Sequence, residues 1–238
     1  MAARPARGHV VLLSGGMDSA TVLATAVRAG GPVHALTLHY GQRHARELAA
    51  ARALARHFRV REHQVLRLPI GPILRSALTD PSRPLPRGST RRSKGSIPPT
   101  YVPARNTIFL SIALGCAESR GLDTIWIGAN AIDYSGYPDC RPEYLRAFER
   151  LARLATKTGV EGSTRFRVRA PLLRLTKAEI VRLGEKLGVP WGLTWSCYEG
   201  ADRPCGRCDS CRWRAKGFRE AGRPDPALAG PRPRSRRR

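Results

Sequence analysis

The first group of residues that could carry chemistry lies near the start of the chain, at Ser14-Gly15-Gly16-Met17-Asp18-Ser19. A short apolar run at residues 9–13 precedes it, and apolar residues with helical spacing follow it, so the group joins a buried strand to a helix. The glycines let the main chain approach a ligand closely, and Asp18 or Ser19 can cap the helix. Free N–H groups and the helix dipole favour negative charge at such a turn, so we predict an anion site.

The anion predicted at this turn is phosphate, and the motif restricts the kind of phosphate site. The turn lacks the lysine of a Walker-type loop and the G-x-G-x-x-G pattern of a dinucleotide-binding turn. Its six residues resemble the pyrophosphate loop of the N-type ATP pyrophosphatases. That resemblance implies cleavage of ATP between the α- and β-phosphates, with AMP transferred to a carboxylate or amide oxygen. An ordinary glycine-rich strand-to-helix turn is the alternative.

A second group of reactive residues lies near the C-terminal end. Four of the six cysteines occur there with the spacing C-x7-C-x2-C-x2-C, at Cys197, Cys205, Cys208 and Cys211. Four thiolates suit tetrahedral zinc, and a site filled by four protein ligands is structural. An iron–sulfur cluster and unliganded cysteines are the alternatives. Cys116 and Cys140 are predicted to be structural thiols, although Cys140 lies in a polar loop where a role near a substrate is the alternative.

Strands and helices alternate along the chain in the order typical of a parallel sheet. We predict strands at residues 9–13, 32–40, 62–68, 122–129 and 166–170. We predict helices after the glycine turn and at residues 45–58, 107–120, 142–157 and 177–187. Thr176 and Glu179 form a capping box for the last of these helices. The alternation predicts an α/β fold with a doubly wound parallel sheet, whose ligands bind at the carboxyl ends of the strands.

The predicted organisation is one ATP-binding α/β domain at residues 1–190, followed by a zinc-binding segment and a C-terminal helix at 191–222. The stretch at 79–99 is rich in proline, glycine, serine and arginine, which indicates a long loop, either a lid or an idle insertion. The Arg- and Pro-rich tail at 223–238 is predicted to be disordered.

The chain is strongly basic, with 42 Lys and Arg residues against 18 Asp and Glu residues and a net charge of +24. Five of the basic residues lie in the 79–99 loop and five more at residues 232–238 of the tail, and only five of the 42 are lysine. A solvated, arginine-biased surface is favoured, and nucleic-acid contact is the alternative. No apolar run is long enough for a membrane span or a signal peptide, so we expect a cytoplasmic protein without membrane contact.

Several motifs, in the same order, resemble the 7-cyano-7-deazaguanine synthase family of PP-loop enzymes, over residues 9–225. They lie at residues 13–19, 39–44, 102–106, 133–143, 175–179 and 197–211. The resemblance implies a HUP-type fold, one structural Zn²⁺ per chain, Mg²⁺ with ATP, and a homodimer. It implies a ligase that adenylates 7-carboxy-7-deazaguanine and then its amide, so that ammonia gives the nitrile 7-cyano-7-deazaguanine of queuosine and deazapurine biosynthesis.

The resemblance also implies roles for individual residues. The ATP-binding segment comprises Leu13, Ser14, Gly15, Gly16, Met17, Asp18, Ser19, Ala20, Thr21, Val22 and Leu23. The pyrophosphate end is expected to be held by Ser14, Gly15, Gly16, Asp18 and Ser19, with Asp18 also a candidate Mg²⁺ ligand. Arg105 and Lys177 are expected to offset charge that develops on the phosphates. Asp133 and Asp139 are candidates for the hydrogen-bond donor edge of the deazaguanine ring, with two solvated loop carboxylates as the alternative.

Two other classes of function stay open at this point. One is another PP-loop enzyme, either tRNA-modifying or deazapurine-conjugating, for which the basic surface would be functional. The other is a non-catalytic zinc-ribbon protein that binds RNA, against which the intact 14–19 loop argues. The family pattern does not require the basic 81–99 loop or the arginine tail. A tRNA nucleoside, a modified DNA base and a deazapurine metabolite are therefore all open as destinations of the product.

Overall fold

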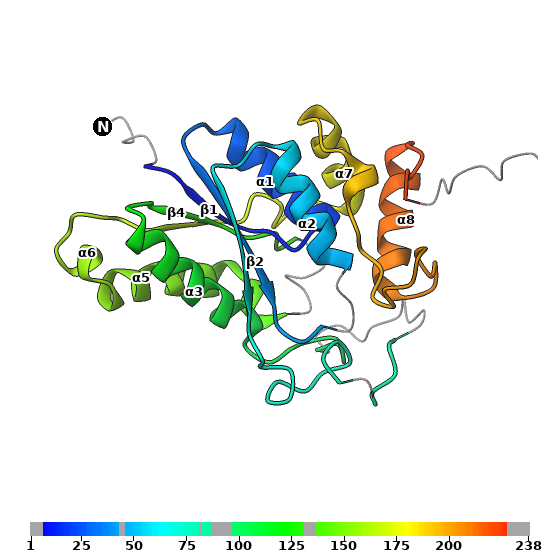
Figure 1. Cartoon of the computed structure of the whole chain (residues 1–238), viewed down its shortest axis with the longest axis horizontal. Helices are drawn as coiled ribbons and strands as arrows, with labels where there is room; N and C mark the ends of the chain where they lie inside the picture. The colour runs from blue at the N-terminus through cyan, green and yellow to red at the C-terminus, as the bar shows by residue number, and fades with distance from the viewer. Residues whose placement is uncertain (1–6, 43–45, 81, 87–96, 131–136, 228–238) are drawn as a thin grey trace, which may run out of the picture.

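This computed structural model describes residues 7–42, 46–80, 82–86, 97–130 and 137–227. Asp133, much of the basic loop and the end of the arginine tail lie outside these ranges, so the expectations for them are not addressed by the structure. Figure 1 shows the chain from the first strand in blue to the last helix in red.

The core of the fold is a five-stranded, wholly parallel sheet. Its strands are β1 (His9–Leu12), β2 (Val33–His39), β3 (Glu62–Arg67), β4 (Thr124–Trp126) and β5 (Arg167–Arg169). They pair in the order β3-β2-β1-β4-β5, which places β1 at the centre. All four residues of β1 are buried, as expected for an inner parallel strand. The predicted doubly wound α/β sheet is therefore confirmed.

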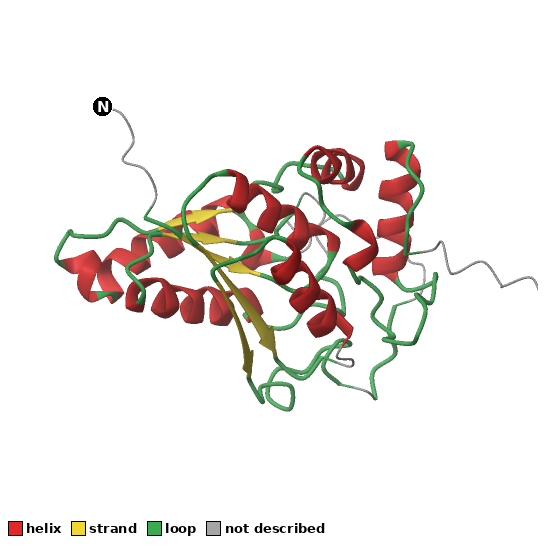
Figure 2. Ribbon diagram, turned by 45° about the horizontal axis from the view of Figure 1, so that its top comes forward, coloured by secondary structure: helices red, strands yellow, loops and turns green. Residues whose placement is uncertain are grey.

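Helices cover both faces of this sheet (Figure 2). They are α1 (Met17–Arg28), α2 (Arg46–His57), α3 (Arg105–Ser119), α5 (Pro142–Ala155), α6 (Lys157–Val160), α7 (Lys177–Lys186) and α8 (Asp209–Ala221). Val11 and Leu13 share one apolar core with side chains of α1, α2, α7 and α8, among them Leu23, Leu54, Ile180 and Phe218. Val10 and Leu12 share the other core with α3 and α5, through Leu110 and Phe148. The alternation of β1 side chains thus anchors both layers.

Most helices and strands agree with those predicted from the sequence, but one helix and one strand differ. Thr176 and Glu179 form the predicted capping box of α7, with Thr176 N–H donating to Glu179 Oε2 at 2.8 Å. The predicted helix 142–157 is divided into α5 and α6, because Thr156 is extended and caps α6 by accepting from Gly159 N–H at 3.1 Å. The predicted strand 122–129 is shorter, since β4 ends at Trp126.

A buried ion pair joins the segment after α8 to the rest of the fold. Arg214 of α8 donates to both carboxylate oxygens of Asp225, at 2.8 and 2.9 Å, and both side chains are almost wholly buried. Arg214 also donates to Thr194 Oγ1 at 2.7 Å and to the carbonyl of Trp191 at 3.2 Å. Trp191 begins the short 3-10 helix η2 (Trp191–Leu193), so one guanidinium joins α8, η2 and the segment at residue 225.

Within the part of the chain that the structure describes, no helix combines the length and the hydropathy needed to cross a bilayer.

Candidate active site

The turn after β1 folds around the hydroxyl group of Ser19. Backbone N–H groups of Ser14 and Gly15 each donate to Ser19 Oγ at 3.2 Å, and Ser19 Oγ lies 3.1 Å from the carbonyl of Gly16. The residue at the N-cap of α1 is Gly16, without a side-chain cap, so the expectation that Asp18 or Ser19 caps this helix is wrong. Ser19 lies inside the helix and turns its hydroxyl back to hold the loop.

The open end of α1 nevertheless offers donors to an anion. The first intrahelical bond runs from Ala20 N–H to the carbonyl of Gly16 at 3.0 Å. The preceding amides of Met17, Asp18 and Ser19 therefore stand at the positive end of the helix dipole, where phosphate oxygens bind in other proteins. The anion site predicted from the sequence has the necessary backbone geometry.

The two loop glycines serve different purposes. Gly15 has φ +91°, and a Cβ built there would lie 2.4 Å from the carbonyl oxygen of Glu47 and 2.9 Å from the amide nitrogen of Ala51. Gly16 has φ −79°, and its nearest neighbour would be the carbonyl oxygen of Trp195 at 3.5 Å. Close approach to a ligand was the expected reason for both residues. At Gly15 the close approach is to α2 itself.

We expect Gly15→Ala to lower the melting temperature and remove ATP binding, while Gly16→Ala leaves the melting temperature nearly unchanged. A side chain at Gly15 adds backbone strain of about 1–3 kcal/mol to a clash with main-chain atoms that cannot move independently. Thermal unfolding and nucleotide titration of both variants measure this difference. Equal melting temperatures for the two variants would contradict the assignment.

Asp18, Lys177 and Asn130 meet beside this loop. Lys177, the first residue of α7, donates from Nζ to Asp18 Oδ2 at 2.6 Å, and Asn130 Nδ2 donates to the same oxygen at 3.2 Å. The other oxygen, Asp18 Oδ1, is buried, and none of the described residues donates a hydrogen bond to it. A buried carboxylate oxygen without a partner is costly, so this atom is positioned for a cation or a donor from a ligand.

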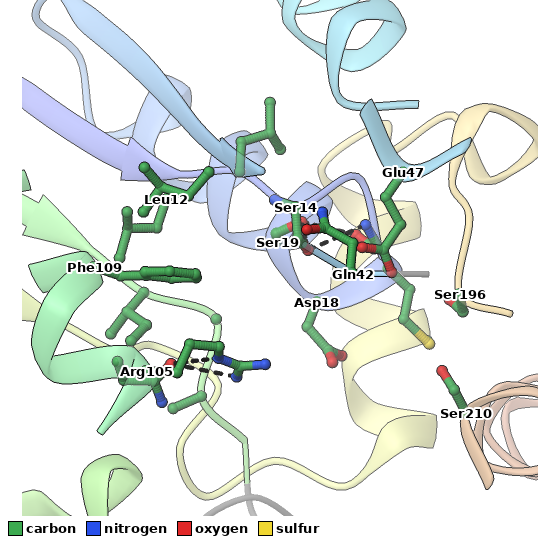
Figure 3. A pocket seen from close by; sticks show the side chains of 18 of the residues that line it. Leu12, Ser14, Asp18, Ser19, Gln42, Glu47, Arg105, Phe109, Ser196 and Ser210 are labelled. Carbon is green, nitrogen blue, oxygen red and sulfur yellow. Dashed lines mark hydrogen bonds between the residues drawn. The ribbon is translucent and has the colours of Figure 1, made fainter. Parts of the chain in front are cut away.

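Asp18 and Lys177 line a cavity of about 290 Å³ at the carboxyl ends of the central strands. Figure 3 shows Ser14, Asp18, Ser19, Gln42, Glu47, Arg105, Phe109, Ser196 and Ser210 around it. Leu12, Leu36, Leu38 and Ile127 give one side of the cavity an apolar lining. A cavity with an apolar side and a few convergent polar groups is typical of a small-molecule site.

Arg105 enters the same cavity from the start of α3. Its guanidinium lies 5.8 Å from the ring centres of both Tyr40 and Phe109 and donates to Asn106 Oδ1 at 3.3 and 3.4 Å. No ion pair joins Arg105 to a carboxylate among the described residues. Because aromatic rings and a neutral amide hold the guanidinium, its positive charge is available to pair with an anionic ligand. This agrees with the expectation that Arg105 offsets negative charge on the phosphates.

The two predicted substrate carboxylates have different outcomes. Asp133 lies outside the described residues. Asp139, in the 3-10 turn η1 (Pro138–Cys140), is 6% exposed, and its Oδ2 accepts from the backbone N–H of Asn106 at 3.0 Å. It therefore supports the start of α3, and the neighbouring Cys140 lines the cavity. Asn106 Nδ2 donates to Cys140 Sγ at 3.1 Å, which links the two segments a second time.

The four clustered cysteines form a candidate metal site. Their sulfur atoms all lie within 4.8 Å of one another, a spacing that suits four thiolates around one tetrahedral ion. Backbone N–H groups of Cys205 and Cys208 donate to Cys197 Sγ and Cys205 Sγ, each at 3.3 Å. The hydrogen bond between Cys211 and Cys208 lowers the pKa of the Cys208 thiol and raises that of Cys211, because the two sulfur atoms share one proton.

The segment at residues 195–211, called the cysteine segment here, is also one wall of the cavity. The backbone N–H of Trp195 donates to the carbonyl of Gly15 at 2.9 Å, so this segment is bonded directly to the turn at residues 14–19, called the phosphate loop here. Arg46 of α2 lies over the Trp195 ring at 5.1 Å and forms an ion pair with Asp202. Tyr198 of the same segment lines the cavity. The sequence displayed the four candidate metal ligands, but nothing in it indicated that their segment reaches the turn at residues 14–19.

Residues that sequence reasoning left out of the site include Tyr40, Gln42, Glu47, Asn106, Asn130, Phe109 and Trp195. Tyr40 and Gln42 follow directly after β2, at the sheet edge where ligands bind, and that position was a usable signal. Glu47 lies in a polar helix whose sequence gives no comparable signal.

Comparison with known proteins agrees with this geometry. A family model described as "Queuosine biosynthesis protein QueC" matches residues 8–222. A protein of Anaeromyxobacter sp. (strain Fw109-5), named 7-cyano-7-deazaguanine synthase, is 56% identical over 230 residues, covering 96% of this chain and 98% of that protein. A protein of Frankia casuarinae with the same name is 56% identical over 225 residues, covering 94% of each chain.

Among solved structures, the NMN synthetase from Francisella tularensis is similar with a TM-score of 0.50. It is 18% identical, and the match covers 94% of this chain and 82% of that one. At this identity the likeness supports the fold and no more. The family and the fold inferred from the sequence are both confirmed by these comparisons.

Proposed function

This chain belongs to the QueC family of queuosine biosynthesis proteins, and on that premise we propose that it makes 7-cyano-7-deazaguanine from 7-carboxy-7-deazaguanine and ammonia. It is an enzyme of the ligase type, and ATP supplies the driving force. The observation that carries the proposal is the cavity in which the phosphate loop, Asp18, Lys177 and Arg105 converge. The reaction needs such a site twice, because two oxygen atoms must leave one carbon.

The chemistry explains why a pyrophosphate loop suits this reaction. A carboxylate is a poor electrophile, and transfer of AMP to its oxygen creates a leaving group that ammonia displaces to give an amide. Loss of water from the amide requires activation of the remaining oxygen, by a second ATP. Donors aimed at the phosphates stabilise the charge that develops in both transfers. One loop serves both if the amide stays in the cavity.

The residues that would perform these steps lie on the cavity wall. The amides at the start of α1 would hold the leaving pyrophosphate, while Lys177 and Arg105 would offset negative charge on the phosphates. Asp18 fits the Mg²⁺ that accompanies ATP, because its Oδ1 is buried without a partner and Mg²⁺ prefers carboxylate oxygen. Bound there, Mg²⁺ would neutralise phosphate charge. Asp133 and Asp139 remain proposed contacts of the deazaguanine ring.

The metal of the cysteine site is proposed to be one structural Zn²⁺ per chain. The four ligands are all sulfur, a set that zinc accepts in closed tetrahedral sites. Residues 191–222 would then act as one zinc-binding unit attached to the ATP-binding domain at 1–190.

Small molecules are the proposed partners, and the cytoplasm is the proposed compartment. A homodimer is proposed as well, supported by exposed apolar side chains on neighbouring helices: Leu151, Leu154 and Val160. Nucleic-acid contact is not favoured.

The decisive experiment incubates the pure protein with Mg-ATP, ammonium and 7-carboxy-7-deazaguanine and identifies the products by mass. We expect the nitrile, with two AMP and two pyrophosphate for each nitrile formed. Amide as the final product would restrict the activity to the first half-reaction. Unchanged substrate, in protein with a full complement of metal, would overturn the proposal and direct attention to a macromolecular substrate.

A further inference from the structure

One carboxylate of the cavity has no role in the mechanism given above. Glu47 is the second residue of α2 and lines the same cavity as Ser14 and Asp18. The backbone of α2 at this point is packed against Gly15, which fixes the start of the helix beside the phosphate loop. Figure 3 shows the Glu47 side chain extending from α2 toward Ser14, Ser19 and Gln42.

Glu47 differs from the other carboxylates of this cavity in having no partner. In the part of the chain that the structure describes, no hydrogen bond or ion pair reaches its side chain. Asp18 is held by Lys177 and Asn130. Asp209 begins α8 directly beside Cys208 and is 9% exposed. A half-buried carboxylate without a partner destabilises the fold unless it meets a cation or a proton.

The surroundings of Glu47 favour a proton acceptor that works near neutral pH. Burial raises the pKa of Glu47 to about 7, and the positive charge of Arg105 acts in the opposite direction. The other charged and titratable groups that line the cavity are Asp18 from α1, Arg105 from α3, Lys177 from α7, Asp209 and Arg214 from α8, and Tyr40, Tyr137, Cys140 and Tyr198 from the segments between helices and strands. General bases are most effective when their pKa lies close to the working pH.

The chemistry of the proposed function, on which this inference rests, requires such a group. Ammonium predominates over ammonia at neutral pH, and it has no lone pair with which to attack an acyl adenylate. It must lose a proton inside the cavity before a C–N bond can form. Neither Asp18, which is paired with Lys177, nor the positively charged Arg105 is suited to take that proton.

We infer that Glu47 binds the ammonium substrate and accepts its proton. The proton moves from nitrogen to the Glu47 carboxylate, which releases ammonia beside the adenylate. The nitrogen lone pair forms the C–N bond, and the bond from carbon to the AMP oxygen breaks with its electron pair on AMP. The attacking nitrogen then loses a second proton to solvent, leaving the neutral amide, and Glu47 returns its own proton to solvent through the open cavity.

The test compares two nucleophiles in Glu47→Gln and wild-type protein. Hydroxylamine is largely unprotonated at neutral pH and needs no base before it attacks an acyl adenylate. We expect the ammonium-dependent rate of the variant to fall by about 10²-fold, and the rate of hydroxamate formation to fall far less. Glu143→Gln is the matched control, because Glu143 is also the second residue of a helix, α5, and is exposed outside the cavity.

A pH profile gives an independent readout of the same step. The wild-type rate at fixed total ammonium should rise with pH and level off above about pH 7, where Glu47 is deprotonated. The variant should follow free ammonia and continue to rise about tenfold per pH unit across this range.

The outcomes separate this inference from the proposed function. Equal losses of rate with ammonium and with hydroxylamine would overturn the inference and assign Glu47 to Mg²⁺ or phosphate binding. A pH profile that is the same in Glu47→Gln and wild-type protein would also overturn the inference. Unaltered kinetics in Glu47→Gln would overturn it outright. If wild-type protein forms neither amide nor hydroxamate from 7-carboxy-7-deazaguanine, the proposed function itself fails.

Discussion

Asp18→Asn is expected to reduce nitrile formation by about 10³-fold or more while leaving the fold and the bound metal intact. The substitution keeps the shape of the side chain and removes the charge that Lys177 and a magnesium ion would share. The substitution also places an amide nitrogen, which cannot bind a metal ion, where the buried Oδ1 of Asp18 would hold Mg²⁺. Loss of the charge and loss of the metal ligand both weaken the binding of the ATP phosphates, so adenylation should be lost together with overall turnover. The release of AMP and pyrophosphate measures adenylation.

A matched control separates this effect from the simple loss of an ion pair. Glu161→Gln breaks the exposed pair between Lys157 and Glu161, whose atoms lie 3.8 Å apart on the surface. Exposed pairs contribute about 0–1 kcal/mol, so this variant should retain wild-type turnover and stability. If Asp18→Asn retained more than a tenth of wild-type turnover, Asp18 could not have the role assigned to it.

The second large effect is expected for Cys208→Ser. We expect this variant to lose its metal and to melt roughly 10 °C lower, because removal of a structural zinc costs several kcal/mol of folding free energy. Activity should fall as well, since the cysteine segment bonds to Gly15 through Trp195 and forms a wall of the cavity. Elemental analysis, a melting curve and the nitrile assay report the three effects.

Cys116→Ser provides the control for this experiment. Cys116 lies on α3, partly exposed and outside the cysteine cluster. Its substitution should leave one zinc per chain and change stability by about 1 kcal/mol or less. Full activity in metal-free Cys208→Ser would show that the wall does not depend on the metal.

The features that were predicted correctly are local in the sequence. The β1 strand, the glycine turn and α1 are continuous, so their order alone predicted the strand-to-helix turn that the structure shows. The anion at this turn stays a prediction. The capping box at Thr176 and Glu179 spans one helical turn, and the four cysteines that come together as a candidate metal site lie within fifteen residues. Such patterns depend on backbone preferences and ligand chemistry, which sequence displays directly.

The features that were missed depend on contacts between distant segments. Sequence gave no indication that Glu47 would lie beside Gly15, because the contact exists only once α2 packs against the turn. The role of Asp139 at the start of α3 depends on a hydrogen bond to Asn106, 33 residues earlier. The capping error at Asp18 and Ser19 arose because Ser19 bonds backward to the loop instead of forward into the helix.

The bond between Trp195 and Gly15 has a consequence for how the protein is made. These residues are separated by most of the chain, and contacts across such distances form only after the intervening segments are ordered. During synthesis, β1 and α1 leave the ribosome long before η2 and the cysteine segment exist. The contact between the phosphate loop and Trp195 therefore forms late in folding. A nascent chain that stalls before residue 195 lacks the cysteine segment, so its phosphate loop is exposed to chaperones and proteases.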